Sequence, residues 1–149
     1  MTLDEISKHL TDLGFECETA PTKSGIFIKR TIRNLPIVTY IFTKDKFLYM
    51  DVSNENISKH ILKSNLPANT LIYKKLSDLN DTVRFGTWFI KNVDNKPISI
   101  AFRYSFPLSC INALPIDEIL NAMNNEVALT NQSIEIFIKG KNEVKDICF

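Results

Sequence analysis

A strict alternation of side chains over residues 98–106 constrains this chain more than any other feature. Large apolar side chains take every second position: Ile98, Ile100, Phe102, Tyr104 and Phe106. Small or polar side chains stand between them: Ser99, Ala101, Arg103 and Ser105. A period of two is typical of a strand with one buried face and one wet or lightly covered face, as in antiparallel sheets.

The residues before this segment predict its partner strand. Asp94 and Asn95 both tolerate positive φ, so they suit a tight hairpin turn. We therefore expect residues 85–93 to form a strand that pairs with residues 98–106.

Two earlier segments, residues 37–42 and 47–52, carry large apolar side chains on both faces of the strands they predict. In the second, Tyr49 opposes Leu48 and Met50. With residues 26–32 they indicate an antiparallel meander. Helices must cover one face. The other face is open to three explanations: helices on both sides, strands that are simply central, or a surface for a partner or a second copy.

Helix signals flank these strands. Thr2 and Glu5 have the spacing of a capping box, and Gly14 suits the end of the first helix. Ser53 or Asn54 can cap a second helix, which Pro67 interrupts, with a further helical turn or two over residues 71–79.

A long helix is predicted from Pro115 to about Lys139, with Gly140 as its stop. Residues 130–139 are ambiguous, because Ile134, Ile136 and Ile138 also alternate as in a strand. The fold class expected is α+β, in the order helix, antiparallel β-meander, helix, β-hairpin, long C-terminal helix. We expect residues 1–149 to form a single domain with a short C-terminal tail, 141–149.

Charge and composition exclude several classes of protein. The 18 basic and 17 acidic residues leave a formal charge of +1, which predicts no general electrostatic attraction to nucleic acid or to a membrane surface. No stretch is apolar for long enough to span a bilayer, and the start of the chain lacks the features of a signal peptide, so we expect the cytoplasm. Three cysteines, Cys17, Cys110 and Cys148, indicate reduced thiols rather than a disulfide framework.

Catalytic patterns are not found in the sequence. His9 and His60 each follow a lysine and have no partner at metal-ligand spacing, and the four glycines are too far apart for a phosphate loop. Cys17 stands between two glutamates, which disfavour a thiolate. We expect no enzyme, no cofactor and no metal. An enzyme would need a deep pocket that brings His9, His60 or a cysteine beside a carboxylate.

The strands supply the candidate binding residues instead: Tyr40, Phe42, Tyr49, Trp88, Phe89 and Arg103. Basic and aromatic residues on a sheet can also stack on single-stranded nucleic acid, but no ribonucleoprotein motif accompanies them, so a protein or peptide partner is favoured.

The order of elements is similar to the type III secretion chaperone-like fold, and within it the chain resembles the YbjN family, described as proposed bacterial sensory-transduction regulators. The matching segments are Leu13-Gly14-Phe15, Leu79-Asn80, the hairpin from Arg84 to Phe106, and Leu114-Pro115-Ile116-Asp117. The connection from Pro107 to Ala113 lacks the glycine-rich turn expected there.

The resemblance implies a bacterial protein without catalysis or cofactor, a possible homodimer, and a surface that holds an extended polypeptide. The leading hypothesis is thus a chaperone-like or regulatory module that binds a polypeptide partner through an apolar sheet face. The alternative is an immunity or antitoxin protein that caps a toxin domain.

Overall fold

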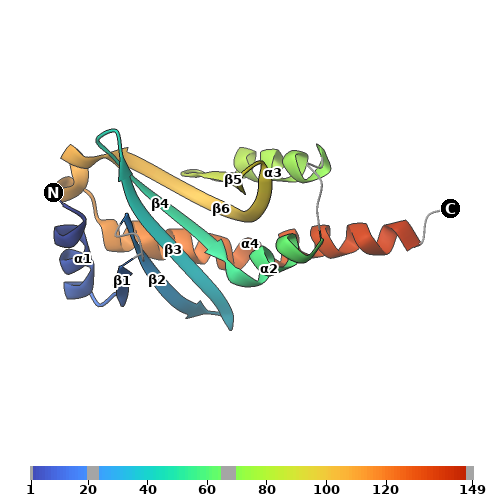
Figure 1. Cartoon of the computed structure of the whole chain (residues 1–149), viewed down its shortest axis with the longest axis horizontal. Coiled ribbons are helices and arrows are strands. Elements are labelled where there is room, and N and C mark those ends of the chain that lie inside the picture. The colour runs from blue at the N-terminus through green and yellow to red at the C-terminus, as the bar shows by residue number, and fades with distance from the viewer. Residues whose placement is uncertain (1, 20–23, 65–69, 147–149) are drawn as a thin grey trace.

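The computed structural model describes residues 2–19, 24–64 and 70–146, and it has the α+β architecture that the pattern predicts (Figure 1). In chain order its elements are α1 (Leu3–Asp12), β1 (Cys17–Thr19), β2 (Gly25–Ile32), β3 (Leu35–Lys44), β4 (Phe47–Asn54), α2 (Glu55–Ser64), α3 (Thr70–Thr82), β5 (Thr87–Val93), β6 (Lys96–Pro107), the 3₁₀ helix η1 (Leu108–Ala113) and α4 (Ile116–Asp146).

The six described strands form one antiparallel sheet in the order β1-β2-β3-β4-β6-β5. Two-residue turns join β2 to β3, β3 to β4 and β5 to β6, and their central residues have positive φ: Arg33 and Asn34, Asp45 and Lys46, Asp94 and Asn95. Paired positive φ angles match the right-handed twist of hairpin strands. The turn predicted at Asp94 and Asn95 is therefore confirmed.

Helices cover one face of this sheet. In Figure 1, α4 passes behind β2, β3 and β4, and α2 and α3 each contact α4. Side chains of one parity on the strands fill the space between sheet and helices: Ile26, Ile28, Ile37, Ile41, Leu48, Met50, Val52, Trp88, Phe102 and Phe106. The opposite face meets a described helix at its β6 end, where the hydroxyls of Ser58 of α2 and Ser99 of β6 are 2.6 Å apart. Its aromatic side chains on β2, β3 and β4 stay partly exposed. For the described residues, helices on both faces therefore does not explain the apolar surplus of β3 and β4.

The first and second helices begin as predicted. Thr2 and Glu5 form the capping box, with backbone to side-chain distances of 3.2 and 3.3 Å. Of the two candidate caps for α2, Asn54 acts, because its Oδ1 accepts a hydrogen bond from the Asn56 amide at 2.9 Å. Pro67 lies outside the described residues. The predicted helical turn or two over residues 71–79 is a full helix of 13 residues, α3.

The last helix is longer than predicted. Residues 130–139 are helical, as the predicted long helix requires. Gly140 does not end this helix, which continues to Asp146. A glycine inside a helix costs only about 1 kcal/mol relative to alanine, so good helix formers after it can outweigh that cost. The predicted tail 141–149 is therefore helical as far as Asp146, and its last three residues lie outside the described ones. No helix among the described residues is both long and apolar enough to cross a membrane.

Candidate functional site

Five partly exposed aromatic side chains lie on the face of the sheet opposite α4, which we call the aromatic face: Phe27, Tyr40, Phe42, Tyr49 and Phe89. Four of them stack in a row from β2 to β4. The ring centroids are 4.7 Å apart for Phe27 and Tyr40, 5.1 Å for Tyr40 and Phe42, and 5.0 Å for Phe42 and Tyr49. Interplanar angles of 10° to 25° show that the rings stack face against face.

The strand register produces this row. Phe27 lies directly opposite Tyr40 across β2 and β3, and Phe42 lies directly opposite Tyr49 across β3 and β4. Tyr40 and Phe42 are two residues apart, so they share a face of β3. Cross-strand aromatic pairs each contribute roughly 0.2–1 kcal/mol. The row therefore helps to hold three strands in register, while one side of it remains uncovered by any described helix.

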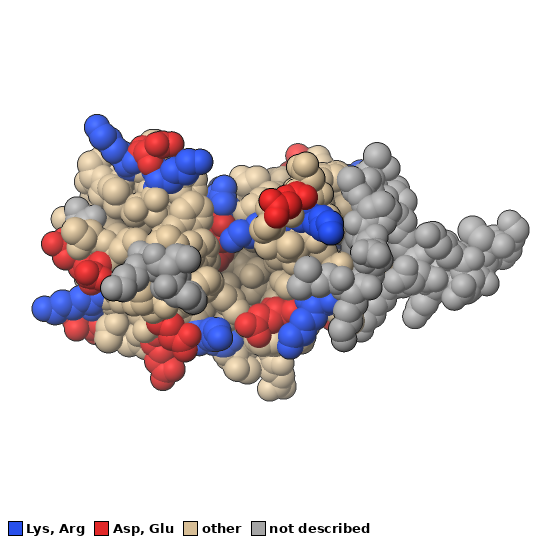
Figure 2. Space-filling model, viewed as in Figure 1, with Lys and Arg blue, Asp and Glu red and all other residues tan. Residues whose placement is uncertain are grey.

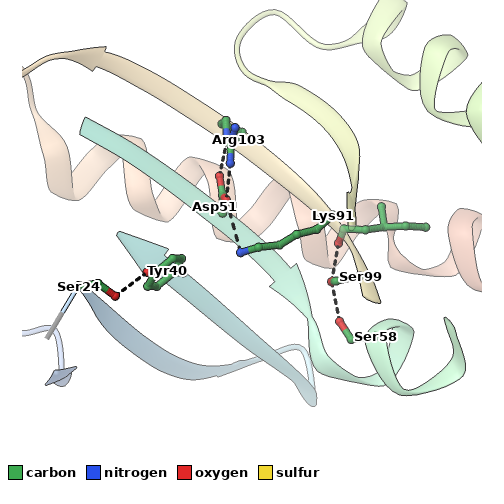
Figure 3. A network of polar contacts seen from close by, with 8 residues as sticks. Ser24, Tyr40, Asp51, Ser58, Lys91, Ser99 and Arg103 are labelled. Atoms are coloured by element: carbon green, nitrogen blue, oxygen red, sulfur yellow. Dashed lines mark hydrogen bonds and ion pairs between the residues drawn. The ribbon is translucent and has the colours of Figure 1, made fainter. Parts of the chain in front are cut away.

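A charge cluster around a buried carboxylate lies beside the row, on the same face (Figure 3). Asp51 of β4 is opposite Arg103 of β6 and accepts two hydrogen bonds from it, from Nε to Oδ1 at 2.7 Å and from Nη2 to Oδ2 at 2.9 Å. The Lys91 Nζ reaches across from β5 to within 3.8 Å of Asp51 Oδ2. The Asp51 side chain is 3% exposed, whereas those of Arg103 and Lys91 are each 34% exposed.

Asp51 further stabilises the charged form of Arg103. Its hydrogen bond raises the pKa of the Arg103 guanidinium above the ordinary value, and this outweighs the opposing effect of burial. Two cations thus surround one carboxylate, and the centre of the face carries an excess of positive charge. In Figure 2, which shows this side of the molecule, basic and acidic atoms meet at a hollow in the middle of the face.

The cations also lie against the rings. The Arg103 guanidinium carbon is 4.5 Å from the Phe89 ring centroid, 5.1 Å from that of Tyr49 and 5.6 Å from that of Phe42. Lys91 Nζ is 4.9 Å from the Tyr40 ring centroid. Because Phe42 has a stacked ring on each side and Tyr49 has Phe42 and Arg103, neither presents a free ring face. A nucleobase needs such a face in order to stack.

The candidate catalytic residues are spread over the molecule. His60 of α2 has its Nε2 4.0 Å from Glu135 of α4, and His9 lies on α1, far along the chain from it. Cys17 and Cys110 are free and partly buried, and Cys148 lies outside the described residues. Among the described residues, no three His, Cys, Asp or Glu side chains come together as metal ligands would.

Three surface hollows are likewise without these groups. Their volumes are about 160, 330 and 270 Å³. The first lies at the Lys29 end of β2, the second beside the start of α1, and the third between Phe85 and α4. No histidine or cysteine lines any of the three.

Five of the six residues selected from the sequence share the aromatic face: Tyr40, Phe42, Tyr49, Phe89 and Arg103. Trp88 does not. It is 3% exposed and packs on the helix-covered face against Phe102, so its selection as a surface residue is corrected. Its parity is opposite to that of Phe89, and on a strand neighbours point to opposite faces.

Three residues of the face were missed in the sequence: Phe27, Asp51 and Lys91. A signal for each was present. Asp51 is the one charge in the apolar run from Phe47 to Val52 and shares the parity of Tyr49. Lys91 shares the parity of Phe89, and Phe27 alternates with the buried Ile26 and Ile28.

The chain has an antiparallel sheet with helices on one face and the aromatic face on the other. It therefore belongs to the class of α+β folds in which one face of the sheet forms part of the molecular surface. The chain is similar in structure to the crystal structure of YbjN from E. coli, described as that of a proposed transcription regulator. The TM-score is 0.61 at 13% sequence identity, over 89% of this chain and 93% of that one. This likeness shows a shared fold. No family model and no curated protein matches the sequence.

Proposed function

We propose that this chain is a non-catalytic module, chaperone-like or regulatory, that binds a polypeptide partner on its aromatic face. The observation that carries the proposal is the row of stacked rings that no described helix covers. Contiguous exposed apolar patches mark interaction sites, and aromatic residues and arginine are enriched at such sites. The fold shared with YbjN, itself described as a proposed regulator, is compatible with this role.

The edges of the sheet favour binding across the face over addition of a strand. At the β5 edge, the Asn80 side chain hydrogen-bonds both backbone groups of Trp88. Its Oδ1 accepts a hydrogen bond from the Trp88 amide at 2.6 Å, and its Nδ2 donates one to the Trp88 carbonyl at 3.1 Å. A side chain that takes both groups blocks an incoming strand there. At the other edge, β1 has only three residues.

The proposal is tested with a soluble, permanently unfolded polypeptide, reduced and carboxymethylated α-lactalbumin, by fluorescence anisotropy. The wild-type chain is expected to bind it. A variant with Phe42→Ser and Tyr49→Ser should bind at least about tenfold more weakly, because it loses two central apolar anchors. Circular dichroism establishes that the variant is folded.

The matched control changes two exposed apolar residues away from the face, Leu13→Ser and Tyr73→Ser, which are 42% and 48% exposed. This control should bind as the wild type does. Equal binding by both double variants, or none by the wild type, would refute the proposal. The alternative, an immunity protein that caps a toxin, remains a prediction; it requires a folded toxin domain as the ligand and no affinity for the unfolded chain.

A further inference from the structure

We propose that the segment bound on the aromatic face carries an aspartate or glutamate between apolar side chains, and that its carboxylate binds beside Arg103 and Lys91. This inference names the chemistry of the partner and rests on the proposed function.

The charge at the centre is not balanced within the described residues. Asp51 is the buried acceptor for both cations, at 2.7 and 2.9 Å from Arg103 and 3.8 Å from Lys91. One carboxylate cannot neutralise two cations, so one positive charge remains. Both cations are partly exposed, whereas Asp51 is not. An arriving ligand therefore meets the positive groups.

Arg103 retains hydrogen-bond donors for such a ligand. A guanidinium has five N–H groups, and Asp51 takes two of them. The remaining three have no partner among the described residues. Hydrogen bonds from arginine to a carboxylate are among the stronger ones in proteins. The rings around Arg103 reduce the local dielectric, which strengthens the attraction further.

The surroundings of this charge select against other occupants. Nucleobases find no free ring face on Phe42 or Tyr49, the two rings of the row that lie against Arg103. A second copy placed face to face would bring two positive centres together, which costs free energy. A phosphate carries more negative charge than the single excess cation balances. A lone carboxylate with apolar neighbours fits both the charge and the aromatic row.

The test selects the ligand from a random pool. Short randomised peptides displayed on phage are panned on the full-length chain, after removal of those that bind the Phe42→Ser, Tyr49→Ser variant. The peptides recovered should be enriched in Asp or Glu flanked by Leu, Ile, Val or Phe. The strongest binder is then synthesised with capped ends, beside a twin in which its acidic residue is replaced by the matching amide.

Lys91→Met is the decisive variant. It removes the excess charge but leaves the pair between Asp51 and Arg103 intact, so the fold should survive. On the wild type, the amide twin should bind about tenfold more weakly than the acidic peptide. On Lys91→Met this ratio should fall to about twofold or less. Lys74→Met, an equal loss of charge on α3, should keep the wild-type ratio.

The outcomes separate this inference from the proposed function. Recovered peptides that lack an acidic residue, or an acidic peptide that binds no better than its amide twin, overturn the inference and leave the proposed function standing. No enrichment at all overturns both. Displacement of the peptide by inorganic phosphate or by an oligothymidylate, or a dimer in light scattering that the Phe42→Ser, Tyr49→Ser variant abolishes, assigns the face to a different occupant and overturns the inference.

Discussion

At the residue scale, the pair of Asp51 and Arg103 decides how the face works. Burying a carboxylate until it is 3% exposed removes its water, and the cost is offset only if its partners replace that water. Arg103 does this with two hydrogen bonds, and Lys91 adds a third positive contact. The pair is therefore both a structural link between β4 and β6 and the source of the charge on the face.

Removing one partner of this pair should be much worse than removing both. Arg103→Met leaves the Asp51 carboxylate buried with Lys91 alone, and we expect a loss of about 2–4 kcal/mol in the free energy of unfolding. In the double variant Asp51→Asn, Arg103→Met the buried carboxylate is removed together with its partner, so most of that loss should be recovered. Urea denaturation of four proteins, the wild type, Asp51→Asn, Arg103→Met and the double variant, measures this, and losses that add would show that the two side chains are not coupled.

The pH dependence of this contribution follows from the raised pKa of Arg103. A group whose pKa is raised on folding stabilises the protein below its unfolded pKa, and the contribution is lost only as pH rises through the folded pKa. For Arg103 the folded and the unfolded pKa both lie above the pH range of the experiment. The difference in unfolding free energy between the wild type and the double variant should hence be constant from about pH 7 to pH 9. A decline across that range, measured by urea denaturation, would contradict this assignment.

At the element scale, the hairpin of β5 and β6 depends on how the chain enters it. Gly86 precedes β5 with φ of 72°, in the left-handed region. A Cβ at this position would lie 2.5 Å from Phe102 Cζ and 2.9 Å from the Arg103 carbonyl oxygen. Because residue 86 is a glycine, the backbone just before β5 can pack directly against β6, the strand that carries Arg103.

Gly86→Ala is expected to cost about 2–4 kcal/mol of unfolding free energy, because left-handed strain and overpacking act together. Gly14 is the matched control. It has φ of 97°, but a Cβ there meets nothing within 4 Å. Gly14→Ala should therefore cost only the strain, about 1–2 kcal/mol. Thermal or urea unfolding compares the two, and equal losses would argue against the close approach to Phe102.

At the scale of the whole molecule, the two faces of the sheet differ in exposure to solvent. The described helices cover one face and bury Trp88 there, while the aromatic face remains partly exposed. The chain has one tryptophan, so its fluorescence reports on the covered face alone. A tryptophan moved to the other face would report on the proposed site.

Trp88 emission should be weakly quenched by acrylamide and should not change when an acidic apolar peptide binds, since the residue is 3% exposed on the far side of the sheet. In a variant with Trp88→Phe and Tyr49→Trp, quenching should be stronger and the emission should shift on binding. The first change is tolerable, because the Trp88 Nε1 is buried and has no hydrogen-bond partner within residues 2–19, 24–64 and 70–146. A binding-induced shift in the wild type, with none in the variant, would place the ligand elsewhere.

Local patterns in the sequence predicted much of the fold. The alternation over residues 98–106 places each side chain on the correct face of β6, the capping box begins α1, and Asp94 and Asn95 turn the last hairpin. These features depend on residues close in the chain, whose geometry follows from two periods, 2.0 and 3.6. The aromatic residues of β3 and β4 could be predicted as candidate binding residues for the same reason.

The amino-acid sequence by itself determined which side chains share a face of each strand. Only the tertiary structure decided which of those faces the helices cover, and with it that Trp88 is buried while Phe89 is not. It also decided that Asp51, Lys91 and Arg103 meet, since they lie on three strands and their contact depends on register between distant segments. Burial and long-range pairing are properties of the assembled sheet, and no local period encodes them.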